Sequence, residues 1–208
     1  DIGEKTAFIA IASGAGVKEL FLNSGATYVI DGGVNMNASV GEIVSDLSKI
    51  SSGSILLVPN HKNLIPAADG AAELMGENVS VLPTESVLEG LECVFEFDPE
   101  VSADQNLEAL SEIRYSMKVV SIFSSAKDIN VGNFYASEGQ PVAMCDGEVF
   151  MVGSEIQDLL VETIMLAGGG DCDHVTVLVG NDKDVLDVQS TIEILNKAFS
   201  DFEDIEVE

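Results

Sequence analysis

The sequence has few basic residues, few cysteines and no tryptophan, and the first two shortages argue against whole classes of protein. Its 208 residues include 9 Lys and Arg against 36 Asp and Glu, which gives a formal net charge of −27. Such a surface repels phosphates and anionic lipid headgroups, so we expect neither nucleic acid nor a membrane surface as a partner. The acidity serves either a protein partner with a basic patch or solubility alone.

The three cysteines, Cys93, Cys145 and Cys172, show no CxxC spacing. An odd number without that spacing argues against a disulfide framework and a zinc knuckle, and it favours a reducing compartment. No leader pattern opens the sequence, and no apolar run approaches the roughly 20 residues of a membrane-spanning helix. These features predict a cytoplasmic protein without membrane insertion.

Apolar runs of strand length alternate with helical patterns through the first half of the sequence. Short parallel strands can be joined only by crossover helices, so four such units predict a wound parallel sheet. Ser39 and Glu42 form a capping-box pattern at the start of the second helix. The predicted strands cover 6–12, 26–31, 54–60 and 79–84, and the helices cover 16–25, a segment from Ser39, 63–75 and a segment from Ser86.

The alternation stops near Pro99. We place a boundary there between a parallel α/β lobe, 1–99, and a mixed α/β lobe, 100–208, which together form one two-lobed α/β domain. The second lobe is predicted to open with a helix that Ser102 and Gln105 cap.

A strand is then predicted over 118–126. Beyond it, alternating residues and the turn pairs Glu138-Gly139 and Asp146-Gly147 predict β-hairpins, so the second lobe should be mixed and not parallel.

The last third of the chain is predicted to hold two more helices and two more strands. The first helix runs from Ser154, with Gln157 as its capping-box partner, to Leu166, and the strands cover 173–180 and 204–208. No turn or closing element follows the last strand, so we expect a fragment of a longer protein. One face of the second helix carries Val188, Ile192, Leu195 and Phe199.

In an open parallel sheet, ligands bind beyond the carboxyl ends of the strands. Glycines there let a ligand approach the backbone, and amides at helix starts favour a carboxylate or phosphate. Polar, glycine-rich loops also occur simply to turn the chain, so a binding site and an ordinary turn both remain open. The candidate ligand-binding or partner-binding residues are Ser13, Gly14, Gly16, Gly32, Gly33, Asn35, Asn37, Ser39, Asn60, His61, Lys62, Asn63 and Thr84.

The sequence lacks the motifs GxxxxGK[ST] and GxSxG, and its GAGVKEL segment holds only two of the three glycines of a dinucleotide fingerprint. Asp31 does end the second strand where a ribose-binding acid would stand. We therefore expect no catalytic residue, no metal and no cofactor in this chain. His61 is a candidate base or attachment point, and Cys172 with His174 makes only a weak metal pattern.

Four motifs follow successive strands in an order that resembles the C-terminal region of dihydroxyacetone-kinase-like proteins, the family that includes the A-type chain of bacterial fatty-acid kinase. The resemblance covers nearly the whole chain, and its motifs are SGAG, GGVNMNAS, VPNHKN and LPT. The family pattern also marks Met36, Pro59 and Pro83. Asp31 stands where the family leads us to expect Glu, and His61 replaces a second Asn.

The resemblance implies a fold related to the DegV-type fatty-acid-binding proteins and to the substrate-binding subunit of dihydroxyacetone kinase. It implies that ATP and Mg²⁺ belong to a separate N-terminal kinase domain of the same parent chain. That complex would phosphorylate a fatty acid held by a DegV-type partner. Both ends of the present chain look trimmed relative to this family.

Three functions follow as alternatives: a non-catalytic domain that docks the fatty-acid-binding partner, a stand-alone fatty-acid or small-anion binder, and a dihydroxyacetone-type subunit that uses His61. The segment Ala12-Ser13-Gly14 lacks the Asp-Ser pair expected of a DegV-type acyl binder, which favours docking. Enzymatic activity is then expected only within an ATP-dependent kinase. The physiological ligand and a homodimer are left open.

Overall fold

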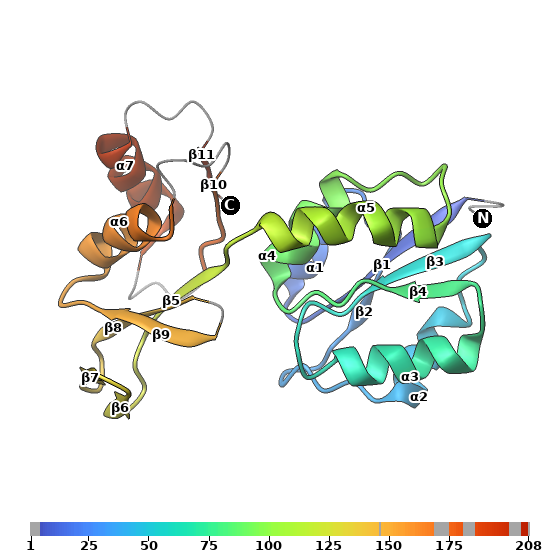
Figure 1. The fold of residues 1–208 in the computed structure, drawn as a ribbon, viewed down its shortest axis with the longest axis horizontal. Coiled ribbons are helices and arrows are strands. Elements are labelled where there is room, and N and C mark those ends of the chain that lie inside the picture. The colour runs from blue at the N-terminus through green and yellow to red at the C-terminus, as the bar shows by residue number, and fades with distance from the viewer. Residues whose placement is uncertain (1–4, 146, 169–174, 181–185, 200–204, 208) are drawn as a thin grey trace. The chain divides into compact units, whose positions relative to one another are not determined.

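The computed structural model describes residues 5–145, 147–168, 175–180, 186–199 and 205–207 (Figure 1). The chain divides into two compact units, Asp1–Met117 and Lys118–Glu208. Among the described residues, no helix combines the length and the apolar character that crossing a membrane requires.

The first unit is built on a four-stranded parallel sheet in the order β2-β1-β3-β4. Its strands are β1 (Thr6–Ala12), β2 (Tyr28–Asp31), β3 (Ser54–Val58) and β4 (Val79–Val81). Every residue of β1 is buried, as expected for a central strand that is covered on both faces. The wound parallel sheet predicted from the sequence is confirmed.

Helices cover both faces of this sheet (Figure 1). Even-numbered β1 residues such as Phe8 pack with Phe21 and Leu56 on one face, and odd-numbered ones such as Ile9 pack with Ile43 on the other. The first face carries α1 (Ala15–Asn23), α4 (Val87–Phe95) and α5 (Ala103–Ser116), and the second carries α2 (Val40–Leu47) and α3 (Ile65–Met75). The capping boxes predicted at the starts of α2 and α5 both form.

The division between the compact units falls after Met117, whereas the sequence pattern changes near Pro99. The difference comes from α5, because its Ala103 and Leu110 are buried in the core cluster that contains alternate residues of β1. The segment before α5 also pairs with β1, since the backbone N–H of Thr6 donates to the carbonyl of Pro99 at 3.0 Å. Helix α5 is therefore part of the first unit.

The second unit contains strands of both orientations, which confirms the mixed α/β class. Strands β5 (Val120–Ser124), β8 (Pro141–Cys145) and β9 (Glu148–Val152) form an antiparallel sheet, and β6 (Ile129–Val131) pairs antiparallel with β7 (Phe134–Ala136). Strand β10 (Val175–Val177) pairs parallel with β11 (Ile205–Val207). Its helices are α6 (Ile156–Leu166) and α7 (Val188–Ala198).

Of the two predicted hairpin turns, one is confirmed and one is wrong. Gly147, at φ 82°, lies between the paired strands β8 and β9, while its neighbour Asp146 lies outside the described residues. The Glu138-Gly139 pair instead joins β7 to β8, which belong to different sheets. The hairpin that β7 forms is with β6, and its loop contains Gly132 at φ 59°.

Two details of the predicted helices also differ. The capping box of Ser154 and Gln157 does not form, because α6 begins at Ile156 and its N-cap, Glu155, makes no side-chain capping bond. On α7, Leu195 and Phe199 are buried as predicted, but Val188 is 41% exposed. Thr191 takes the buried position instead, and its hydroxyl donates to the carbonyl of Asp187 at 2.8 Å.

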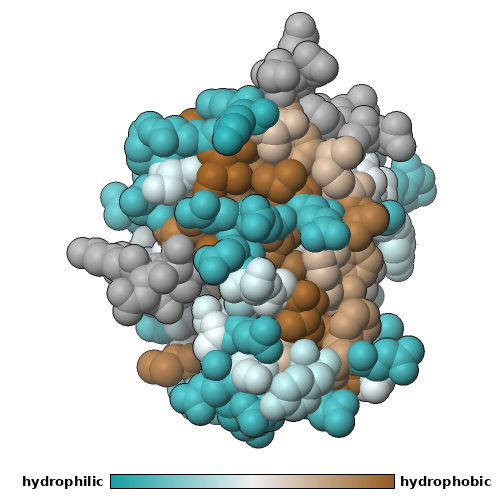
Figure 2. Space-filling model, turned by 90° about the vertical axis from the view of Figure 1, so that its left-hand side faces the viewer, coloured by the Kyte–Doolittle hydropathy of each residue, from teal (hydrophilic) through white to brown (hydrophobic). Residues whose placement is uncertain are grey.

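Large apolar side chains reach the surface of the second unit among polar ones (Figure 2). Met165 and Leu166 at the end of α6 are 53% and 60% exposed, and Phe134 on β7 is 37% exposed. Isolated apolar side chains at a surface are ordinary in folded proteins.

Candidate functional site

The strand order places the carboxyl ends of β1 and β3 side by side at a switch point. The chain leaves β1 through α1 on one face of the sheet and enters β3 from α2 on the other. Open α/β sheets bind ligands beyond the carboxyl ends of strands at such a point. We call residues 13–16, 32–39, 60–63 and 83–84 the strand-end face, and they contain all the candidate residues predicted from sequence.

The loop after β1 is shaped by Gly14, the N-cap of α1. Its φ of 86° lies in the left-handed region that favours glycine, and no side chain caps the helix. Ser13 is half-buried, whereas Gly14 and Gly16 are exposed. A Cβ at Gly16 would meet nothing within 4 Å, so packing does not require glycine there.

The loop after β2 folds around the carboxylate of Asp31. The N–H of Gly33 donates to Oδ1 at 2.9 Å, and the ammonium of Lys18 lies 2.6 Å from Oδ2. The hydrogen bond from Lys18, followed by that from Gly33, lowers the pKa of Asp31. Gly32 is buried, and a Cβ there would lie 2.6 Å from Sδ of Met36, so this glycine makes room for the methionine.

The remainder of this loop divides between capping and exposed amides. Ser39 caps α2, because the N–H of Glu42 donates to its Oγ at 3.3 Å and its own N–H donates to the Glu42 carboxylate at 2.8 Å. The hydrogen bonds that Ser39 donates lower the pKa of Glu42. Asn35 and Asn37 are exposed, so their side-chain amides are open to a partner.

Asn60 and Thr84 lie inside the protein. Asn60 is 2% exposed and Thr84 is fully buried. The Thr84 hydroxyl accepts from the Asn60 backbone N–H at 2.9 Å and donates to Asn60 Oδ1 at 3.0 Å. Asn60 Nδ2 donates to the carbonyl of Ile11 at 3.2 Å. The two side chains thus tie together the ends of β1 and β3 and the segment after β4.

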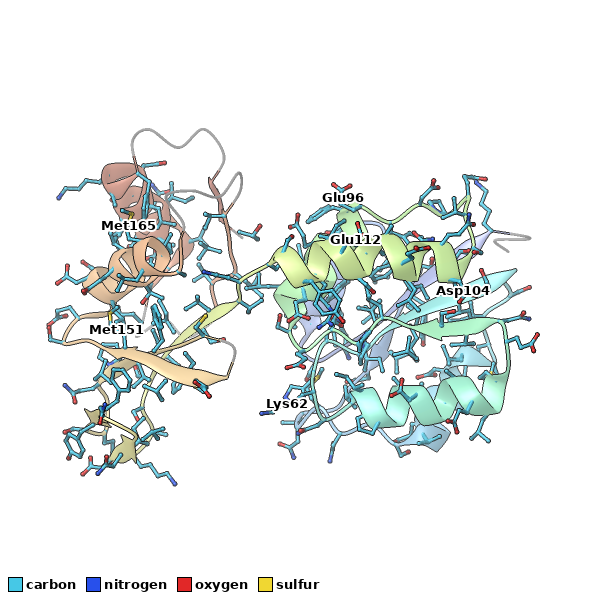
Figure 3. All side chains as sticks on the ribbon, in the orientation of Figure 1. Lys62, Glu96, Asp104, Glu112, Met151 and Met165 are labelled. Atoms are coloured by element: carbon cyan, nitrogen blue, oxygen red, sulfur yellow. The ribbon has the colours of Figure 1, made fainter. Side chains whose placement is uncertain are left out.

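The residues after Asn60 face outward. The N–H of Asn63 donates to Nδ1 of His61 at 3.1 Å, so a neutral His61 carries its ring proton on Nε2. Lys62 and Asn63 are exposed, and Figure 3 shows Lys62 extending away from the loop. Lys62 pairs with no carboxylate among the described residues. The other bases of the first unit, Lys5, Lys18, Lys49 and Arg114, each do.

A buried charged pair joins α4 and α5, and no sequence pattern indicates it. Nη1 of Arg114 lies 3.7 Å from Oε2 of Glu89, with both side chains less than one-fifth exposed. Burial raises the pKa of Glu89, and it raises the pKa of the nearby Cys93 thiol to about 12. The helical spacing correctly predicts an inward stem for Arg114, but Glu89 resembles an ordinary first-turn acid.

In the parts of the chain that the structure describes, no group of three or more His, Cys, Asp or Glu side chains could hold a metal ion. Cys172 and His174 lie outside those parts. The strand-end face offers exposed glycine backbone, two amides and one cation. Such groups suit recognition of a polar or anionic surface.

A family model for the C-terminal domain of FakA-like fatty acid kinase proteins matches residues 7–208. Similar curated proteins are uncharacterized proteins of Staphylococcus haemolyticus, 28% identical over 98% of this chain, and Staphylococcus epidermidis, 27% identical over 98%. Another, from Staphylococcus aureus, is 24% identical over 96%. The chain spans 36% of the length of each. It belongs to the FakA-like, C-terminal family of fatty acid kinase proteins.

Proposed function

We propose that this chain is a non-catalytic docking domain of a cytoplasmic fatty acid kinase. It binds a DegV-type fatty-acid-binding protein, whose bound acyl group is phosphorylated by a separate domain of the parent chain. ATP and Mg²⁺ belong to that separate domain, and the present chain supplies no step of the transfer. The observation that carries this proposal is the family match over residues 7–208.

The charges of the chain support docking. A net charge of −27 attracts a basic protein surface and accelerates encounter at low salt. Lys62 adds a local contrast, because it is exposed and unpaired among the described residues while neighbouring bases are neutralised. A single cation opposite a carboxylate of the partner fixes the orientation of the complex, which is the usual contribution of charged contacts to specificity.

Calorimetric titration of this chain with the DegV-type protein of its host tests the proposal. The partner is used both loaded with fatty acid and empty, at low and at moderate salt. We expect saturable binding whose Kd rises with salt, because charged contacts are screened over about 10 Å at 0.1 M salt. No heat with either form of the partner would sink the docking function for this chain.

A pair of charge-neutralising variants locates the contact. Lys62→Gln is expected to raise Kd about three- to tenfold, as the loss of one charged interface contact does. Lys49→Gln is the matched control, because Lys49 is an exposed base of the same unit that already pairs with Asp46 at 2.5 Å. Equal effects of the two substitutions would show that only net charge matters and that the strand-end face is not the contact.

A further inference from the structure

Asn60 has an uncommon backbone conformation at the strand-end face. Its φ of 58° lies in the left-handed region, which non-glycine residues seldom adopt and Asn tolerates better than most. The residue closely follows β3 and is buried. A conformation of this kind persists when the surrounding structure holds it in place.

Three other parts of the first unit hold Asn60. Thr84 bonds both its backbone N–H and its Oδ1, and the carbonyl of Ile11 accepts from its Nδ2. Helix α4 approaches at Gly90, where an added Cβ would lie 2.0 Å from Oδ1. Both polar atoms of the side chain are therefore used within the fold, and glycine at position 90 is what lets the amide fit.

The direction in which the chain leaves β3 depends on this residue. Immediately afterwards the N–H of Leu64 donates to the carbonyl of His61 at 2.9 Å, and α3 begins at Ile65. The 61–63 loop is thus a tight turn between a fixed Asn60 and a helix. Lys62 is at its centre, so its position is set by the residue at the base of the turn.

We propose that Asn60 and Thr84 are positioning residues that set the 61–63 loop, and that Lys62 makes the contact with the partner. The loop-setting part stands on the contacts above, and the contact part rests on the proposed function. Thr84 is a better site for the test than Asn60, because Thr84→Val removes the hydroxyl while keeping the shape of the side chain.

Thr6→Val provides a matched control. Thr6 is 2% exposed, and its hydroxyl bonds Ser54 Oγ at 2.7 Å and the Val101 carbonyl at 2.5 Å. The same substitution therefore removes the same number of hydrogen bonds from a buried threonine. Thr6 begins β1, whereas Thr84 lies beyond the carboxyl ends of the strands. Thr84→Ser, which keeps the hydroxyl, tests for rescue.

Hydrogen exchange measures the loop directly and needs no partner. In Thr84→Val we expect exchange in residues 60–64 to accelerate about tenfold, the effect of leaving buried donors unpaired, with recovery in Thr84→Ser. Thr6→Val should leave this segment unchanged. Equal exchange in residues 60–64 for both valine variants would overturn the positioning role, whatever the binding result.

Titration with the loaded DegV-type protein measures the consequence for docking. Thr84→Val should raise Kd about tenfold, while Thr6→Val and Thr84→Ser stay within about threefold of wild type. If exchange changes as expected but Kd does not, the 61–63 loop is not the contact. If wild type itself fails to bind, the proposed function and the Lys62 contact both fall, and exchange alone decides the positioning role.

Discussion

Asn60 Oδ1 occupies the space that a side chain at position 90 would fill, since a Cβ built on Gly90 would stand 2.0 Å from it. The contact joins the end of β3 to the middle of α4. It also gives a helix-interior glycine, which is normally a weakness, a reason to be there.

Gly90→Ala is therefore expected to destabilise the protein. Alanine gains roughly 1 kcal/mol of helix propensity, but displacing Asn60 strands buried polar groups at a cost of about 1–3 kcal/mol each. Gly41→Ala is the control, because Gly41 lies in α2 and a Cβ there would meet nothing within 4 Å. Urea unfolding should show a loss for Gly90→Ala and a gain of up to about 1 kcal/mol for Gly41→Ala. A stabilised Gly90→Ala protein would contradict the packing of Asn60 against α4.

The thiol of Cys93 should be inert in the folded protein. It is fully buried, and burial raises its pKa to about 12, so almost no thiolate exists at neutral pH. Iodoacetamide at pH 8 followed by peptide mass mapping should leave Cys93 unmodified in native buffer. The same treatment in urea should label it fully. Rapid native labelling at Cys93 would mean that α4 separates from α5 under native conditions.

Asp31 should make the protein sensitive to acid. Its pKa is lowered by Lys18 and Gly33, so its carboxylate stabilises the fold above the unfolded pKa of about 3.9. That contribution disappears as the pH falls through the lower folded pKa. Asp31→Asn should therefore be less stable than wild type at pH 7, and the difference should shrink below about pH 4.

Asp69→Asn is the control for this pH series. Asp69 is an exposed acid of α3 that forms no ion pair among the described residues, and the substitution removes the same charge. Urea unfolding at several pH values compares the three proteins. A constant gap between Asp31→Asn and wild type down to low pH would contradict the proposed linkage.

Truncation should separate the two places where the sequence and the structure put a boundary. A chain that ends at residue 117 keeps Leu110 and Ala103 in the first core and should unfold cooperatively. A chain that ends at residue 99 loses both side chains, as well as the bond from Thr6 to Val101. We expect it to lack a cooperative transition by circular dichroism. Cooperative unfolding of the shorter chain would show that α5 is dispensable.

The first sheet could be predicted because its signals are local. A run such as Thr6–Ala12 is apolar on both faces, and glycine-rich or polar loops separate it from a helical pattern. The capping boxes at Ser39 and Ser102 also form as predicted, whereas the one at Ser154 does not. A box pattern marks where a helix can start. Tertiary packing decides the residue at which it does.

Long-range contacts account for the features that were missed. The Glu138-Gly139 pair marks a real turn, but the sequence does not say that β8 pairs with β5 and β9 instead of with β7. The strand-end face follows from the topology alone. The burial of Asn60 does not, because it depends on Thr84 and Gly90, which are 24 and 30 positions away in the sequence.

The bond from Thr6 to Val101 spans 95 positions of sequence, and Thr6 begins the central strand of the first sheet. Contacts of such high order slow folding, because a long loop must close before they form. During synthesis, β1 emerges early but completes its neighbourhood only after α5 has left the ribosome. An entirely buried strand must wait for most of that time, so the yield of soluble protein should depend on chaperones and on growth temperature.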